Sequence, residues 1–159
     1  MMKWKNYCLL LKKQWRWSRG DNLLSFKMKL IREVNEPYQI NGDEQAWKEM
    51  REFGDEDREH FIVLGLDTKL RVLYREVVGI GTLNSFEVHP REVFKKAVMS
   101  SANSIIIGHN HPSGDVEPSD ADRKVYEVLK RCGKILDIQV IDALVFSKEK
   151  YYSFNGGEQ

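Results

Sequence analysis

Cysteine is scarce in this chain of 159 residues, which contains only Cys8 and Cys132. Two cysteines without paired spacing form neither a disulfide framework nor a zinc ribbon, and such usage is typical of a reducing compartment. No apolar run approaches the length that a membrane-spanning helix needs. The N-terminal segment is basic like a secretory leader, but its apolar stretch is too short and no small-residue cleavage site follows. We therefore expect a cytoplasmic protein without a membrane span.

Several common catalytic motifs are missing as well. Gly79 and Gly81 lack the third glycine and the strand-to-helix context of a dinucleotide-binding fingerprint, which leaves a turn. A zinc nucleobase deaminase needs H-x-E together with P-C-x-x-C, and the chain contains neither. The H-E-x-x-H motif of many zinc proteases is also absent. An active site in this chain must therefore be built from another pattern.

The net charge of +1 conceals a strong asymmetry along the chain. Residues 1–32 contain nine lysines and arginines against a single acid, whereas the remainder contains 16 basic and 23 acidic residues. Apolar residues between Trp4 and Trp15 recur at helical spacing, which favours a basic amphipathic helix that can bind nucleic acid or an anionic membrane. Alternatively, this segment packs on the body, stays mobile, or precedes a true start at Met28. We divide the chain into a basic N-terminal arm, residues 1–40, and a domain, residues 41–159.

Within this domain, helical and strand-like patterns alternate. We expect helices over 43–53, with Asp43 as N-cap, over 90–101, opened by Pro90, and over 119–132, closed by Gly133. We expect strands over 61–66, 70–78, 104–108, 135–141, 143–146 and 151–154, the first two as a hairpin. The sequence therefore predicts a single-domain α/β fold in which helices flank a mixed β-sheet.

The most informative segment runs from His109 to Asp122 and reads H-N-H-P-S-G-D-V-E-P-S-D-A-D. Alternate residues of a strand face the same way, so His109 and His111 can point at one metal ion. Asp122, on the following helix, can supply a third ligand. A structural zinc site uses all four coordination positions, whereas two histidines and one carboxylate leave a position open, as in hydrolytic zinc sites.

A purely structural interpretation exists for part of this segment. Ser119 and Asp122 have the spacing of a helix N-cap with an acid at the third helical position, a variant of the capping box. The two interpretations are compatible, because a cap also fixes where a ligand lies. Ser119 is close enough in sequence to present its hydroxyl beside the metal.

The order Glu, His-x-His-Pro and Ser-x-x-Asp, with ten residues between the second histidine and the aspartate, resembles the JAMM motif of MPN-type metalloproteases. The segments V-H-P-R-E-V-F and E-x-F-x-V-L-x-L-D, together with H-N-H-P-S-G-D, resemble the RadC family of this superfamily closely. The resemblance extends from about Glu44 to Phe154. It implies a JAB/MPN (cytidine deaminase-like) fold in a short form that lacks the family's usual N-terminal helix-hairpin-helix region.

The resemblance also implies a role for each matching residue. His109, His111 and Asp122 become ligands of Zn²⁺, and Ser119 becomes the serine on the oxyanion side. The general base is the glutamate at the head of the first core strand, which is Glu59, with Glu52 and Glu56 as nearby rivals. The implied function is a zinc-dependent hydrolase, a metallopeptidase or isopeptidase that cleaves an amide bond in a peptide or protein substrate.

Two other functions compete with this hypothesis. The domain could be a non-catalytic, metal-containing module that binds nucleic acid through the basic arm, in line with the link of the family's name to DNA repair and of its short forms to mobile elements. The acidic body weakens this alternative because it would repel the same ligand. The site could also cleave a phosphodiester, although nucleases more often use two metals and several carboxylates.

Overall fold

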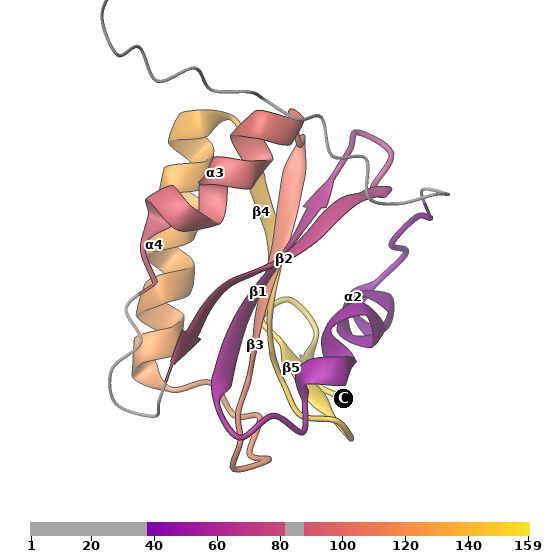
Figure 1. The fold of residues 1–159 in the computed structure, drawn as a ribbon, viewed down its shortest axis with the longest axis vertical. Coiled ribbons are helices and arrows are strands. Elements are labelled where there is room, and N and C mark those ends of the chain that lie inside the picture. Colours follow the sequence, from indigo (N-terminus) through magenta and orange to yellow (C-terminus); the bar gives the residue numbers. More distant parts are fainter. Residues whose placement is uncertain (1–37, 82–87) are drawn as a thin grey trace, which may run out of the picture.

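The computed structural model describes residues 38–81 and 88–159. In these ranges a six-stranded mixed sheet carries helices on both faces, which confirms the predicted α/β architecture (Figure 1). The helical elements are α2 (Asp43–Met50), the 3-10 helix η2 (Arg51–Phe53), α3 (Pro90–Ser100) and α4 (Asp120–Leu136). The strands are β1 (Glu59–Leu66), β2 (Val72–Gly81), β3 (Ser104–Asn110), β4 (Gln139–Phe146), β5 (Tyr151–Ser153) and β6 (Gly157–Glu158).

The strands lie in the order β2-β1-β3-β4-β5-β6. β1 pairs with β2 as the predicted antiparallel hairpin and with β3 antiparallel, whereas β3 and β4 are parallel and are connected through α4. In the pairing of β1 with β3, Phe61 lies opposite His109. The head of β1 and the C-terminal end of β3 therefore meet at the same end of the sheet.

Strand alternation divides the core into two layers. Phe61 and Val63 of β1 and Ile105 and Ile107 of β3 pack under α3 and α4. Their even-numbered neighbours, such as Ile62, Leu64 and Ile106, pack with Met50 under α2 on the other face. Because side chains alternate along β3, His109 continues the series of Ile105 and Ile107 and faces the side of α4.

The predicted boundary between the last long helix and the strand after it is wrong. α4 does not stop at Gly133 but continues to Leu136, and a single strand, β4, replaces the two strands expected over 135–141 and 143–146. Gly133 serves close packing instead, since a Cβ atom there would lie 2.4 Å from the carbonyl oxygen of Ile138. The helix ends at Asp137, which adopts the left-handed conformation with φ of 56°.

The other helices begin close to their predicted starts. α3 begins at Pro90 with His89 as N-cap, as the proline predicted. The helix expected over 43–53 is split into α2 and η2, and its N-cap is Gly42 rather than Asp43. The Asp43 carboxylate instead accepts a hydrogen bond from the amide of Glu44, the next residue, at 2.9 Å.

Candidate metal centre

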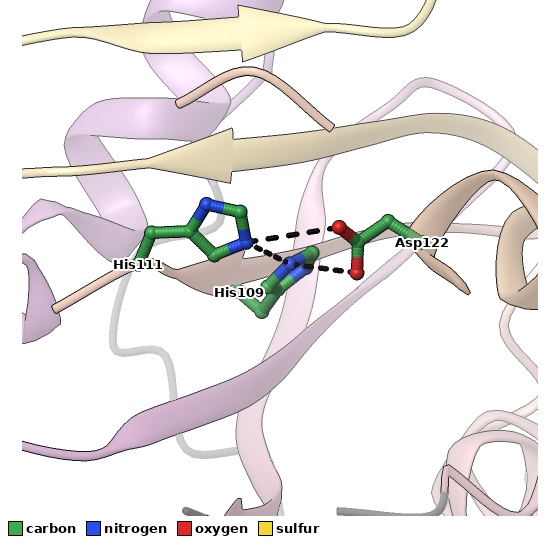
Figure 2. A group of neighbouring side chains, drawn as sticks. All are labelled: His109, His111 and Asp122. Atoms are coloured by element: carbon green, nitrogen blue, oxygen red, sulfur yellow. Dashed lines mark hydrogen bonds and ion pairs between the residues drawn. The ribbon is translucent and has the colours of Figure 1, made fainter. Parts of the chain in front are cut away.

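The two histidines of the H-N-H motif converge as the strand spacing predicts. His109 is the penultimate residue of β3, and His111 follows the strand directly. Their Nε2 atoms lie 3.1 Å apart, and both side chains are largely buried (Figure 2). The ring of Phe61, opposite His109 on β1, is nearly parallel to the His109 ring at a centroid distance of 6.2 Å. Phe61 therefore packs against the ring of this candidate ligand.

Asp122 enters the same cluster from the first turn of α4. Its Oδ1 lies 3.1 Å from Nε2 of His109, and its Oδ2 lies 3.7 Å from Nε2 of His111 (Figure 2). The helix begins with a capping box, in which the Ser119 amide donates to Asp122 Oδ2 at 2.8 Å and the Asp122 amide donates to Ser119 Oγ at 3.2 Å. The cap thus holds the carboxylate in place, and the capping and ligand interpretations agree.

The donor atoms of these three residues have the spacing that zinc requires. Ligand atoms of a tetrahedral zinc site with bonds of about 2.0–2.1 Å lie roughly 3.3 Å from one another. The two Nε2 atoms lie 3.1 Å apart. His109 Nε2 lies 3.1 Å from Asp122 Oδ1, and His111 Nε2 lies 3.7 Å from the other carboxylate oxygen, Oδ2. With one ligand atom taken from each residue, all three atoms lie within 4.8 Å of one another. Two imidazole nitrogens and one carboxylate oxygen also form a donor set that zinc accepts. His109, His111 and Asp122 can therefore hold a metal ion.

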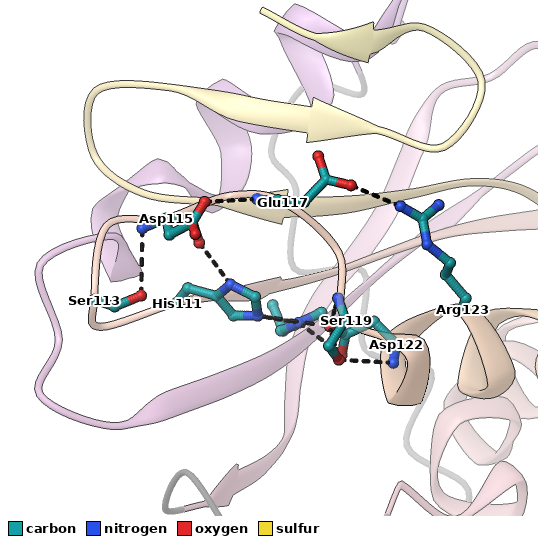
Figure 3. A network of polar contacts seen from close by, with 8 residues as sticks. His111, Ser113, Asp115, Glu117, Ser119, Asp122 and Arg123 are labelled. Carbon is teal, nitrogen blue, oxygen red and sulfur yellow. Dashed lines mark hydrogen bonds and ion pairs between the residues drawn. The ribbon is translucent and has the colours of Figure 1, made fainter.

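A backbone contact orients the second histidine. His111 Nδ1 donates its proton to the carbonyl of Asp115 at 2.6 Å, which leaves the lone pair of Nε2 directed at the cluster (Figure 3). The loop that carries this carbonyl is itself held by the Asp115 amide, which donates to Ser113 Oγ at 3.3 Å, and by the Glu117 amide, which donates to Asp115 Oδ1 at 3.1 Å. Sequence reasoning missed this support because a carbonyl leaves no residue-type signal.

The electrostatics of the cluster favour an ionised carboxylate. Burial raises the pKa of Asp122, but hydrogen bonds from His109, His111 and Ser119 outweigh burial and hold this pKa far below its ordinary value of 3.8. Burial lowers the pKa of His111, but hydrogen bonds with Asp122 and the Asp115 carbonyl outweigh it and hold this pKa above 6.5. The negative charge of Asp122 thus stabilises positive charge in the cluster, from a proton or from a metal ion.

The cluster lines a cavity of about 940 Å³ between α4 and the sheet. Glu59, the first residue of β1, lines this cavity together with His109, His111, Ser119 and Asp122. The rival glutamates lie elsewhere: Glu52 forms an ion pair with Arg75 at 2.5 Å, and Glu56 lines a separate hollow beside the 147–150 turn. The structure therefore brings Glu59, but neither rival, to the same cavity as the three candidate ligands.

Ser119 is nearby, but its hydroxyl is already engaged. Ser119 Oγ donates its single proton to Asp122 Oδ2 at 2.6 Å (Figure 3). On the same helix, Arg123 forms an ion pair with Glu117 at 2.8 Å, which ties the loop after His111 to α4. In this arrangement Ser119 supports Asp122, and an oxyanion would be contacted only after the hydroxyl rotates.

The basic arm proposed as a nucleic-acid-binding segment falls almost entirely outside the described residues, which start at Tyr38. Every helix within residues 38–81 and 88–159 is too short or too polar to span a bilayer. The last residues of the arm are anchored on the domain: Gln39 forms a bridge with Arg71, and Ile40 is buried in the core.

Comparison with known proteins gives a consistent result. Residues 40–159 match the model of a family described as the RadC-like JAB domain. A UPF0758 protein of Chlorobium chlorochromatii (strain CaD3) is 51% identical over 100 residues, which cover 63% of this chain and 45% of that protein. A UPF0758 protein of Chlorobaculum parvum is 46% identical over 116 residues, 72% of this chain and 52% of the relative. One from Staphylococcus haemolyticus is 49% identical over 104 residues, 65% and 46% of the two chains.

These matches confirm the resemblance to RadC that the motifs indicated. The chain spans about half the length of the curated relatives it matches, and the names of those relatives state no activity. The match to the family model covers all the described elements of the fold, including the strand end and the helix start that carry the candidate ligands. The chain belongs to the RadC family through its RadC-like JAB domain.

Proposed function

We propose that this domain is a zinc-dependent hydrolase of the JAMM type, a cytoplasmic metallopeptidase or isopeptidase that cleaves an amide bond in a peptide or protein substrate. The observation that carries the proposal is the convergence of two imidazoles and one carboxylate on a cavity that Glu59 also lines. Three protein ligands leave a fourth position for water or substrate, which is the arrangement of catalytic zinc sites. Membership of a JAB-domain family supports the same assignment.

The proposed division of labour follows from the position of each side chain. When bound by His109, His111 and Asp122, zinc supplies Lewis acidity, which polarises the scissile carbonyl and lowers the pKa of water to about 7. Glu59 faces the same cavity and acts as general base, taking a proton from the attacking water and passing it to the leaving amine. The Asp115 carbonyl holds His111 in the tautomer that offers Nε2.

Ser119 has two tasks in this proposal. Its hydroxyl holds the Asp122 carboxylate while the site is empty of substrate, through the 2.6 Å hydrogen bond to Oδ2. During reaction the same hydroxyl turns toward the carbonyl oxygen of the substrate and stabilises the developing negative charge. Rotation about one side-chain bond is enough for this exchange.

Amide hydrolysis is favoured over cleavage of a nucleic-acid phosphodiester by the number of metal positions. The described residues contain a single cluster of His, Cys, Asp or Glu side chains that could hold an ion, made of His109, His111 and Asp122. Enzymes that cleave phosphodiesters commonly place two metal ions about 4 Å apart, on several carboxylates. A one-metal site with a neighbouring glutamate matches the chemistry of amide hydrolysis.

The metal assignment is tested by measuring the zinc content of purified protein by mass spectrometry. Wild type should contain stoichiometric zinc, and His109→Ala and Asp122→Ala should each lose most of it. His89→Ala is the matched control, because His89 lies at the start of α3 and makes no side-chain cap hydrogen bond. Zinc retained by both ligand variants at the wild-type level would remove the proposal.

The catalytic assignment requires a second measurement. Glu59→Gln should retain zinc but lose turnover of a fluorogenic peptide library by about 100-fold or more, the usual contribution of a general base. Glu52→Gln is the matched control, because Glu52 pairs with Arg75 outside the cavity. Equal turnover by Glu59→Gln and Glu52→Gln would show that Glu59 is not the base.

A further inference from the structure

Asn110, the central residue of the H-N-H motif, contacts a different part of the molecule from its two neighbours. Because side chains alternate along β3, Asn110 points to the face of the sheet opposite His109 and His111. Its side chain is completely buried, at 0% exposure. A primary amide is costly to bury unless its donors and acceptor are hydrogen-bonded, so its partners explain why it is there.

The Asn110 side chain holds the backbone on both sides of Glu59. Its Oδ1 accepts a hydrogen bond from the amide of His60 at 2.6 Å, and its Nδ2 donates to the carbonyl of Arg58 at 3.0 Å. A longer contact of 3.5 Å joins Nδ2 to the carbonyl of Glu56. One side chain thus contacts the residue before Glu59 and the residue after it.

The hydrogen bonds of Asn110 lie just beyond the last residue pair between β1 and β3. The pairing between β1 and β3 runs from Leu66 opposite Ser104 to Phe61 opposite His109 and does not include Glu59. On this side of β1, the hydrogen bonds of the Asn110 side chain therefore take the place of those that a neighbouring strand would make. On the other side, Glu59 pairs with Gly81 at the end of β2.

The placement of Glu59 depends on its backbone. Among the described residues, the Glu59 carboxylate makes no hydrogen bond or ion pair that would hold it in place. A general base must nevertheless lie within hydrogen-bond reach of the proton that it takes. The backbone on either side of Glu59 is therefore what sets the distance from its carboxylate to the ligand cluster.

We propose that Asn110 is a positioning residue for the reaction: it couples the base to the metal centre by holding the start of β1 against the end of β3, which carries His109 and leads directly into His111. This inference rests on the proposed function, because it takes Glu59 as the base. Any movement of the strand end that carries His109 is transmitted through Asn110 to Glu59. The base and the ligands then keep their relative positions.

The test uses the full chain loaded with cobalt(II), whose visible spectrum reports on the coordination site. The pH midpoint of the spectral change is measured for wild type, Glu59→Gln, Asn110→Ala and the double variant. Asn110→Asp provides a second substitution with the same shape, which keeps an acceptor for the His60 amide and loses both donors. Ile106→Ala is the control for stability, because Ile106 is a buried residue of the same strand and face that pairs with Leu64, five residues along β1 from Glu59.

A carboxylate close to the open coordination position opposes loss of a proton there, so its removal lowers the midpoint. We expect Glu59→Gln to lower the midpoint by roughly 1 pH unit. Asn110→Ala should lower it by about half as much and should have no further effect in the Glu59→Gln background, since coupled residues are non-additive. Asn110→Asp should fall between wild type and Asn110→Ala, and Ile106→Ala should match wild type.

The outcomes separate the inference from the proposal beneath it. A midpoint unchanged by Glu59→Gln would overturn the assignment of the base and, with it, the role of Asn110. A midpoint changed by Glu59→Gln but not by either Asn110 variant would overturn the positioning role alone. The positioning role would equally be lost if Asn110→Ala acted additively in the double variant, or if Ile106→Ala produced the same shift.

Discussion

Replacement of Ser119 by alanine tests how far the start of α4 and the metal centre depend on each other. The substitution removes two hydrogen bonds, the 3.2 Å contact from the Asp122 amide and the 2.6 Å contact to Asp122 Oδ2, and it leaves the 2.8 Å bond from the residue 119 amide. Loss of a serine N-cap costs about 1 kcal/mol. The bond to the carboxylate contributes about 1 kcal/mol more, because Asp122 is largely buried.

We therefore expect Ser119→Ala to lower the free energy of unfolding of the metal-free domain by about 2 kcal/mol, and Tm by roughly 4–8 °C. Zinc affinity should fall about tenfold, as is usual when a group that orients a ligand is removed. Urea unfolding in the presence of a chelator measures the first quantity, and competition with a chromophoric chelator measures the second. Ser119→Thr keeps a hydroxyl at the same position and should change both quantities much less.

Two results would contradict this reasoning. If Ser119→Ala weakened zinc binding without loss of stability, the hydroxyl would act on the metal centre by another route than the cap. If Ser119→Thr were as harmful as Ser119→Ala, the effect would arise from packing around the side chain and not from its hydrogen bonds.

Two further predictions concern the stability of the fold. Gly133→Ala should destabilise the domain by about 1–3 kcal/mol in urea unfolding, although alanine is the better helix former, because its Cβ would lie 2.4 Å from the Ile138 carbonyl oxygen. Gly42→Ala has nothing within 4 Å of the added atom and should cost only about 0.5 kcal/mol, because alanine caps α2 less well than glycine. Equal effects of the two substitutions would refute the argument. The metal-free domain should also be most stable between pH 3.8 and 6.5. The raised pKa of His111 contributes stability that is fully present below pH 6.5 and is lost as the pH rises through the raised value. The lowered pKa of Asp122 contributes stability that is fully present above pH 3.8 and is lost as the pH falls through the lowered value. Urea midpoints measured against pH with a chelator present check this, and His111→Ala should remove the decline above pH 6.5; a decline that persists in this variant would assign it to other groups.

Much of the candidate site could be predicted because it depends on local rules. The convergence of His109 and His111 follows from the two-residue period of a strand, and the position of Asp122 follows from the capping box that starts α4. The choice of Glu59 over Glu52 and Glu56 is different, since it came from resemblance. Its physical basis is the pairing of Phe61 with His109, which no local pattern contains.

The features that could not be predicted depend on tertiary contacts that no local sequence pattern contains. A glycine near the end of a helical pattern ordinarily marks the C-terminus, but Gly133 lies within α4, where the Ile138 carbonyl leaves no room for a Cβ atom. In the same way, no local pattern assigns a partner to Asn110, whose side-chain oxygen accepts a hydrogen bond from the His60 amide, 50 residues earlier in the chain. The roles of Gly133 and Asn110 can be recognised only when the residues that each contacts in the folded structure are known.

The tripeptide from His109 to His111 assigns opposite faces of one strand to opposite tasks, with imidazoles toward the cavity and an amide toward the interior. A single inserted or deleted residue within β3 would exchange these faces for every residue beyond it. The histidine side chains would then lie in the apolar core, and the asparagine side chain would line the cavity. A change of length in β3 would therefore displace all three side chains at once, whereas a point substitution removes only one of them.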